Sequence, residues 1–285
     1  MPVVRRTWLF VPGADPQAHD LAARSDADVI IQELEDFTPP DLRPKARALA
    51  ALAYDRWRKA GKVAAVRVNP LETCGREDLA AVMAGRPDIV LMSKVAAPEQ
   101  VRALEQATGG EVDLVPNVET AAGLMRTFEI AKASRRVIAL LVASEDMVAD
   151  LGTNRSRGGG ELAYVRSRFL VECRAAGVEA IDCPYTFSDV KGAVADAKRA
   201  KQLGYRAKSL VDPSHAAPIN RVFSPSPVEV HNARKIVAAF EKARASGRER
   251  ASVLGKLVEV PIYAAAKRLL ESAGRIQPAR RTKGR

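Results

Sequence analysis

The sequence predicts an α/β protein, a (β/α)8 or TIM barrel with a helical extension at its C-terminal end. Short apolar runs alternate with amphipathic segments, which favours a parallel sheet covered by helices. The alternation gives eight units at spacings of roughly 25 residues over about 220 residues, the count and length of this barrel. Polar residues follow the apolar runs, and a barrel builds its active site at that end of its strands.

The expected strands are short and apolar, as is typical of strands buried on both faces of a parallel sheet. The first run ends at Pro12 and Gly13, a signal for a tight turn. The third run carries Arg67 near its end, and the sixth leads to the adjacent acids Glu145 and Asp146. The runs cover residues 7–11, 29–31, 63–68, 89–92, 112–115, 137–142, 180–181 and 207–211.

Segments with helical periodicity follow these runs and complete the expected units. A doubly wound open sheet is the alternative, but the first strand–helix turn lacks the glycine-rich dinucleotide fingerprint. The triple glycine at 158–160 has no strand directly before it, so we interpret it as a mobile loop and not as a phosphate-binding turn. The expected helices cover residues 16–25, 45–59, 78–83, 98–107, 161–176 and 190–203, and another starts at 121–123.

The pattern changes after Asn220, where a Ser-Pro-Ser-Pro segment interrupts the alternation. Two helices are expected beyond it, at 227–245 and 260–273, joined by a segment that contains glycine and serine. We therefore expect a barrel domain at 1–220, a helical extension at 221–275 and a disordered basic tail at 276–285. The extension is compatible with covering the site, docking on a neighbouring subunit or packing on the outside.

Composition narrows the functional classes. The 285 residues carry a net charge of +11, but no nucleic-acid-binding motif accompanies it, so we expect no nucleic-acid partner. No apolar run approaches the roughly 20 residues of a membrane span, and no signal peptide is expected. The three cysteines, Cys74, Cys173 and Cys183, form neither a disulfide framework nor a zinc pattern. These features favour a cytoplasmic enzyme with a small anionic ligand.

The candidate chemistry depends on acids at two strand ends. Glu119 follows the fifth run and Asp146 the sixth, so both would face one divalent cation at the barrel mouth. Two carboxylates without clustered histidines favour Mg2+. Arg67 at the third strand end is suited to gripping a carboxylate, so the set would hold a 2-oxo acid and support carbon–carbon cleavage. A helix cap or dipole interaction at Asp146, or a salt bridge across the rim, is the alternative for each residue alone.

Segments along nearly the whole chain are similar to the citrate lyase β-subunit-like proteins of the HpcH/HpaI aldolase superfamily, which includes malyl-CoA and citramalyl-CoA lyases. Each segment alone is a weak signal, and together in this order they are specific. The matching segments are LFVPG (9–13), LEDFTPP (34–40), VRVNP (66–70), SKV (93–95), VPNVETAAGL (115–124), ASEDMVADLG (143–152), ELAYVRS (161–167), AIDCPY (180–185) and INRVFSPSPVEV (219–230).

The resemblance implies a Mg2+-dependent barrel enzyme that forms a trimer or hexamer. It implies cleavage of a 3-hydroxyacyl-CoA thioester to acetyl- or propionyl-CoA and a 2-oxo acid, or the reverse. The site residues follow by position. Glu119 and Asp146 match the metal ligands, with Glu119 also at the substrate; Arg67 matches the arginine that binds the oxo-acid carboxylate; Glu35 and Asp36 match the acidic pair of the same pocket, and Gly13 matches the turn near the thioester.

The chain departs from the family pattern without losing a matched metal ligand. Glu33 replaces an aspartate, Asn117 an apolar residue and Asp212 a histidine. Ser93 and Ala143 replace a proline and a glycine. These changes put the identity of the substrate in question more than the type of reaction. A carrier-dependent citryl lyase subunit and a CoA-independent aldolase or thioesterase acting on a malyl-type substrate stay open.

Overall fold

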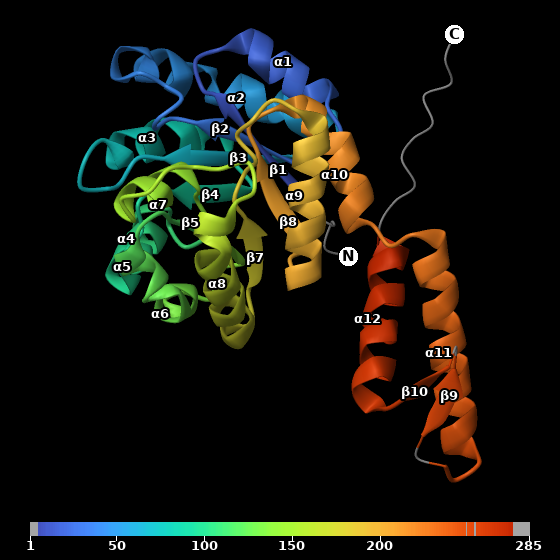
Figure 1. Cartoon of the computed structure of the whole chain (residues 1–285). Helices are drawn as coiled ribbons and strands as arrows, with labels where there is room; N and C mark the ends of the chain where they lie inside the picture. The colour runs from blue at the N-terminus through green and yellow to red at the C-terminus, as the bar shows by residue number, and fades with distance from the viewer. Residues whose placement is uncertain (1–4, 249, 254, 276–285) are drawn as a thin grey trace, which may run out of the picture. The chain divides into compact units, whose positions relative to one another are not determined.

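The computed structural model describes residues 5–248, 250–253 and 255–275 (Figure 1). The chain divides into two compact units, one of residues 5–223 and one that begins at Ser224. The expected disordered tail at 276–285 lies outside the described residues. Among the described residues, no helix combines the length and the apolar character that crossing a bilayer requires.

The first unit is a closed barrel of eight parallel strands in chain order, which confirms the predicted (β/α)8 fold. Strand β1 closes the barrel by pairing with both β2 and β8. The sixth strand starts two residues later than expected, because Val137 forms only an isolated bridge with Leu114. The strands are β1 (Thr7–Pro12), β2 (Val29–Glu33), β3 (Val63–Val68), β4 (Ile89–Met92), β5 (Asp113–Val118), β6 (Ala139–Val142), β7 (Glu179–Asp182) and β8 (Ala207–Leu210).

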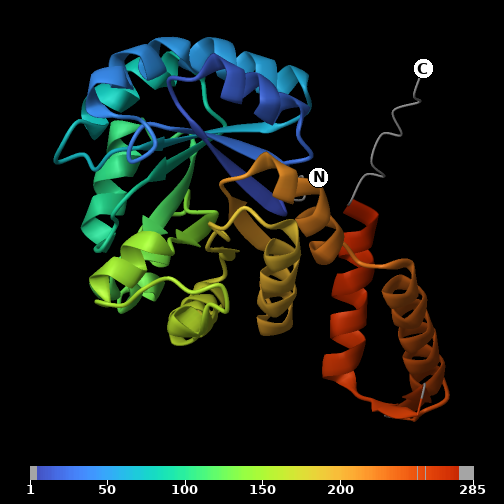
Figure 2. The ribbon, with the colours of Figure 1, turned by 45° about the horizontal axis from the view of Figure 1, so that its top comes forward.

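Helices surround the barrel, as the turned view shows (Figure 2). The sequence pattern locates the long helices and the start of the short helix directly after β5, but it misses the short helices at 127–132 and 216–223, which are too brief to show a period. The helices are α1 (Pro16–Arg24), α2 (Arg43–Lys59), α3 (Gly75–Val82), α4 (Pro98–Ala107), α5 (Ala121–Leu124), α6 (Thr127–Lys132), α7 (Glu145–Asp150), α8 (Ala163–Ala176), α9 (Val190–Leu203) and α10 (Ala216–Phe223), with short 3-10 turns at Pro40–Leu42, Met83–Gly85, Gly160–Leu162 and Pro213–His215.

Alternation along each strand separates two hydrophobic cores. Side chains such as Trp8, Ile31 and Leu91 fill the barrel interior, while their neighbours, such as Leu9 and Ile30, pack in the layer between strands and helices. The period of two residues therefore fixes which side chains can reach the barrel mouth from inside.

The second unit contains α11 (Pro227–Ala245) and α12 (Val260–Arg275), which confirms the expected helical extension. The segment expected as a plain connection instead forms an antiparallel hairpin, β9 (Ala251–Val253) and β10 (Lys256–Val258). Ser226 and Glu229 form a capping box at the start of α11. Phe240 stacks on Tyr263 at a ring-centroid distance of 4.6 Å and joins the two helices.

Candidate active site

Four polar side chains continue the inward-facing rows of the barrel at its carboxyl end. Glu33 follows the inward residues of β2, Arg67 those of β3, and Asn117 and Glu119 those of β5. All four are at least nine-tenths buried. Because apolar side chains fill the interior below them, these groups form a polar layer at the mouth of the barrel.

Arg67 lies at the centre of this polar layer. Strand pairing places it beside Glu33, and its Nε donates a hydrogen bond of 2.9 Å to Glu33 Oε1. Its other nitrogens lie 3.2 Å from Glu35 and 3.6 Å from Glu119. The guanidinium carbon lies 4.9 Å from the centre of the Phe10 ring. The structure thus brings together Arg67, Glu35 and Glu119, which the sequence singled out.

One guanidinium therefore faces three carboxylates. Burial works against the charged form of Arg67, but the charges of Glu33, Glu119 and Glu35 outweigh it and raise the pKa of the arginine. Arg67 stays cationic and holds this acidic group together. The contact with Glu119 is the longest of the three.

Glu119 is fully buried, and its carboxyl group has few hydrogen-bond partners. Burial raises the pKa of Glu119 to about 8, and the charges of Asp146 and Glu35 add to this rise against the opposing effect of Arg67. Its Oε2 has no hydrogen-bond partner, and neither does the side-chain oxygen of the neighbouring Asn117. Buried oxygens without partners are costly, and a cation relieves that cost by accepting them as ligands.

Asp146 approaches Glu119 from the next strand end. Strands β5 and β6 pair through Val118 and Val142, and Asp146 lies in the first turn of α7, just beyond β6. It is half-buried and close enough to affect the pKa of Glu119. The capping alternative is not supported, because Ser144 is the N-cap residue and no side chain caps this helix. A favourable interaction of the acid with the helix dipole remains compatible with this position.

The donor set fits a hard cation better than a soft one. Among the described residues, no group of three histidine, cysteine, aspartate or glutamate side chains is arranged to hold a metal. Two carboxylates with unpartnered oxygens nearby match Mg2+, which takes one or two protein carboxylates and keeps several waters.

Lys94 is a residue of this site that the sequence argument did not single out. Its Nζ contacts Glu35 at 2.5 Å and lies 3.8 Å from the exposed Asp36. Its backbone is left-handed, with a φ of 55°, which aims the side chain across the mouth toward the loop after β2. Burial raises the pKa of Glu35, while Arg67 and Lys94 oppose that rise. A lysine after a strand gives no sequence signal for this unusual conformation.

Glu33, noted in the sequence only as a departure, shapes the loop that carries Glu35. Its two carboxylate oxygens accept hydrogen bonds of 2.6 Å from the backbone N–H groups of Glu35 and Phe37. The same carboxylate binds Arg67. Glu33 therefore holds both the loop and the arginine in place. The sequence signal for this role is an acid at a strand end, whose side chain can accept hydrogen bonds from backbone N–H groups two and four residues later.

Gly13 lies where β1 meets this loop. A Cβ atom there would overlap the carbonyl oxygen of Glu33, and its N–H donates to the hydroxyl of Thr38 at 3.0 Å. Close packing thus explains the glycine, whereas its match to a thioester-binding turn stays a prediction. Asp212, another departure, caps the turn after β8 by accepting a hydrogen bond from Ser214 N–H.

The chain is similar to known proteins over most of its length. Residues 6–213 match the family model described as HpcH/HpaI aldolase/citrate lyase. The chain is 31% identical to the citrate lyase subunit beta of Leuconostoc mesenteroides over 282 residues, covering 95% of this chain and 93% of that protein. It is 32% identical to a (3S)-malyl-CoA thioesterase of Cereibacter sphaeroides over 256 residues, covering 89% of each.

A solved structure of similar shape is that of the protein CitE from Mycobacterium tuberculosis in complex with magnesium, acetoacetate and coenzyme A. The TM-score is 0.80 at 27% sequence identity, and the match covers 95% of this chain and 98% of that chain. The similarity in fold and the similarity in sequence both extend over most of the chain. The chain belongs to the HpcH/HpaI aldolase/citrate lyase family, which includes lyases acting on carbon–carbon bonds.

Proposed function

We propose that the protein is a Mg2+-dependent lyase that cleaves, or forms, a 3-hydroxyacyl-CoA thioester, with acetyl- or propionyl-CoA and a 2-oxo acid as the other side of the reaction. The observation that carries this proposal is the buried Arg67 beside Glu119, with Asp146 on the next strand end. A guanidinium and a pair of acids facing one mouth suit a ligand that bears a carboxylate next to a carbonyl group.

Glu119 and Asp146 would hold the metal. The CitE complex with magnesium and coenzyme A supports the choice of cation and of a CoA thioester as substrate. When bound, Mg2+ would act as a Lewis acid on the negative charge that develops during the reaction. A cation there would also neutralise the charge of Glu119 and weaken its attraction to Arg67. The guanidinium could then bind the carboxylate of the oxo acid.

The protein's own side chains would handle the proton. Cleavage breaks the bond between the carbinol carbon and the carbon next to the thioester. The hydroxyl proton leaves to a base, the oxo acid departs, and the remaining enolate takes a proton at that carbon. Glu35 is our candidate for this exchange, because burial raises its pKa and Lys94 holds it in place at the mouth. Asp36, exposed beside Lys94, is the second candidate.

A panel of CoA thioesters tests the proposal. Malyl-, methylmalyl- and citramalyl-CoA are incubated with the protein, with Mg2+ or with excess chelator, and the 2-oxo acid and acyl-CoA products are measured. We expect release of a 2-oxo acid from at least one thioester, only when Mg2+ is present. Undiminished release in excess chelator would contradict the metal requirement.

The same panel separates two other reactions. The Cereibacter sphaeroides relatives are named (3S)-malyl-CoA thioesterases, and hydrolysis would release free CoA and the intact hydroxy acid without a 2-oxo acid. The citrate lyase relatives are named as subunits, and a carrier-dependent protein would act on a carrier-bound thioester but not on free CoA esters. A homotrimer or hexamer stays a prediction, which the solution mass would test.

The affinity for Mg2+ is expected to fall as the pH is lowered below 8. The pKa of Glu119 is raised to about 8, so at lower pH the carboxyl carries a proton that it must release to bind the cation. One released proton weakens the apparent affinity about tenfold per pH unit. Calorimetric titrations at pH 6, 7 and 8 measure this, and Glu119→Gln, which removes both the proton and one ligand, is expected to bind Mg2+ weakly at all three pH values. Equal affinities of the wild-type protein at all three pH values would contradict it.

A further inference from the structure

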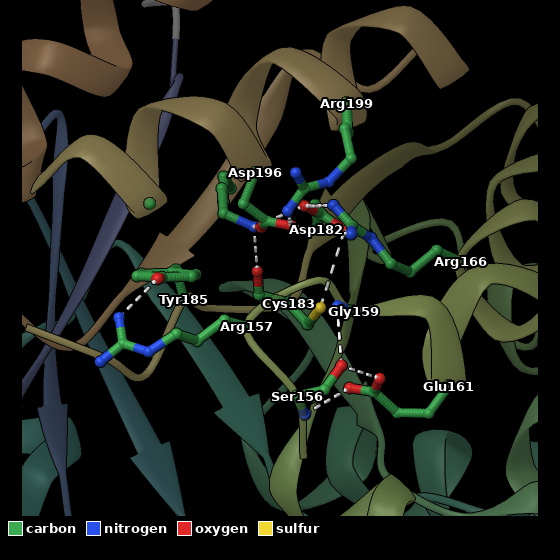
Figure 3. Close-up of polar contacts among 12 residues, drawn as sticks. Ser156, Arg157, Gly159, Glu161, Arg166, Asp182, Cys183, Tyr185, Asp196 and Arg199 are labelled. Carbon is green, nitrogen blue, oxygen red and sulfur yellow. Dashed lines mark hydrogen bonds and ion pairs between the residues drawn. The ribbon is translucent and has the colours of Figure 1, made fainter. Parts of the chain in front are cut away.

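A second buried group of charges lies on the outer face of the barrel wall, between strands and outer helices (Figure 3). Asp182 of β7 and Lys208 of β8 point outward from the barrel, opposite to the inward Ile181 and Ala207. Arg166 of α8 and Asp196 of α9 meet them, and Arg199 joins one turn later on α9. We call these five residues the outer ionic cluster.

The contacts within the outer ionic cluster are short and mostly buried. Lys208 lies 2.6 Å from both Asp182 and Asp196. Arg166 donates two hydrogen bonds to Asp182, of 2.8 Å and 2.7 Å, and one of 3.0 Å to Asp196. Arg199 donates to Asp196 at 3.2 Å, and its side chain is 42% exposed. The cluster thus extends from the barrel wall to the protein surface.

The cluster has one more positive charge than it has negative charges. Burial opposes ionisation, but Lys208 and Arg166 lower the pKa of Asp196, and the pKa values of Lys208 and Arg166 are raised by their aspartate partners. Burial raises the pKa of the adjacent Cys183 thiol to about 12, so it contributes no charge. Three cations and two carboxylates leave an excess of one positive charge. Buried or half-buried charges are expected to be paired.

A pocket of about 370 Å3 opens on the positive side of this cluster. Arg166 and Arg199 line it from two helices, and the triple glycine at 158–160 lines it from the loop before α8. The Nε of Arg199 is buried without a partner, and Arg166 uses three of its five N–H groups in the cluster. Arg199 makes one hydrogen bond in the cluster, through a terminal nitrogen, so both arginines that line the pocket have N–H groups that the cluster does not use.

The loop contributes to the same pocket. Gly159 has a left-handed φ of 68°, and a Cβ built on it would lie 3.4 Å from Arg155 and 3.7 Å from Arg166. These are ordinary contact distances, so the positive φ is what favours glycine here, and the loop backbone lies beside the guanidinium groups. Ala163, the first residue of the 14-residue helix α8, also lines the pocket, so the positive end of the helix dipole borders it.

We propose that this pocket binds a phosphate group, as inorganic phosphate or as part of a small phosphomonoester. Two guanidinium groups, from α8 and α9, supply the donors, and the glycine loop forms a third wall of the pocket. Phosphate has more acceptor oxygens than a carboxylate, so it can bind both guanidinium groups at once. Arginine forks suit phosphate, and a bound anion balances the charge of the cluster. No strand directly precedes the glycines at 158–160, as it would in a nucleotide-binding fingerprint, so the sequence alone did not indicate a phosphate site here.

The test measures binding of inorganic phosphate and of glycerol 3-phosphate by calorimetry, without Mg2+ and with chloride at equal ionic strength as the reference. Arg199→Gln removes one donor and leaves the cluster with two cations and two carboxylates, so the fold is retained. Gln202→Glu places a negative charge on the exposed wall of the pocket. Arg102→Gln is the matched control, because Arg102 also pairs with an acid three residues away, Glu99, on another helix.

We expect both pocket variants to bind phosphate at least about tenfold more weakly than the wild type, since a charge-assisted hydrogen bond is worth that factor or more. Arg102→Gln should bind as the wild type does. Tighter binding of glycerol 3-phosphate than of phosphate would identify a phosphomonoester as the ligand, and the reverse would identify free phosphate. Failure of the wild type to bind either anion, or equal binding by all variants, would overturn the proposal. The site shares no residue with the candidate active site, so this result is independent of the lyase assay.

Discussion

Asp146→Asn is expected to lower turnover by at least about 10³-fold, on the scale found when a group that stabilises developing charge is removed. The amide keeps the size of the side chain but loses the negative charge that a cation requires. Asp146 is half-buried in the first turn of α7 and bears no structural hydrogen bond there, so the fold should be unaffected. Product release from the thioester found active, measured with saturating Mg2+, together with the melting temperature, checks both parts.

Glu145→Gln is the matched control for this variant. Glu145 is the preceding residue on the same turn, is 55% exposed and accepts a hydrogen bond from Thr186 instead of facing Glu119. We expect it to retain turnover near that of the wild type. Equal loss in both variants would show that the charge of the helix start, and not the position of Asp146, matters, and it would remove Asp146 from the proposed metal site.

Arg67→Met is expected to abolish turnover and to destabilise the fold by about 3–5 kcal/mol, the cost of leaving buried charge without its partner. The guanidinium is the shared partner of Glu33, Glu35 and Glu119, and all three carboxylates are buried. Denaturant unfolding at pH 7 measures the stability, and the thioester assay measures the activity. Unchanged stability would mean that these carboxylates take up protons without the arginine.

Arg67→Lys separates the two roles of the residue. An ammonium keeps the positive charge but lacks the planar fork that contacts several carboxylates and grips a substrate carboxylate in two places. We therefore expect most of the stability to return without the activity. Recovery of full turnover in the lysine variant would contradict the proposed grip on the oxo acid and would leave Arg67 with a structural role.

The period of the strands explains why part of the site was predictable. Arg67 and Glu119 lie at the ends of apolar runs, and the alternation of side chains in a strand places both on the inner face of the barrel. Parallel strands in chain order bring those ends to one mouth, so their meeting followed from the fold class alone. Glu35, from the loop after β2, joins them through Arg67 and Lys94.

The remaining contacts depend on backbone detail that no sequence pattern records. Lys94 reaches Glu35 only because its φ is positive, and such a conformation is rare outside glycine. The sequence did not reveal the outer ionic cluster for another reason. Asp182 and Lys208 lie on strands of four residues, too short for an alternation of polar and apolar side chains to show which face of the strand points outward. Charged residues in a buried layer contradict the apolar pattern by which such layers are recognised.

The left-handed backbone at Lys94 has an evolutionary consequence. For a residue with a side chain this conformation costs about 1–2 kcal/mol, which glycine at the same position would not incur. Selection for thermal tolerance alone would therefore favour glycine there, and the charge beside Glu35 would be lost. Stability and activity therefore place opposite demands on position 94. Directed evolution for higher thermal stability is expected to lower activity by replacing the lysine, and selection for activity is expected to keep it.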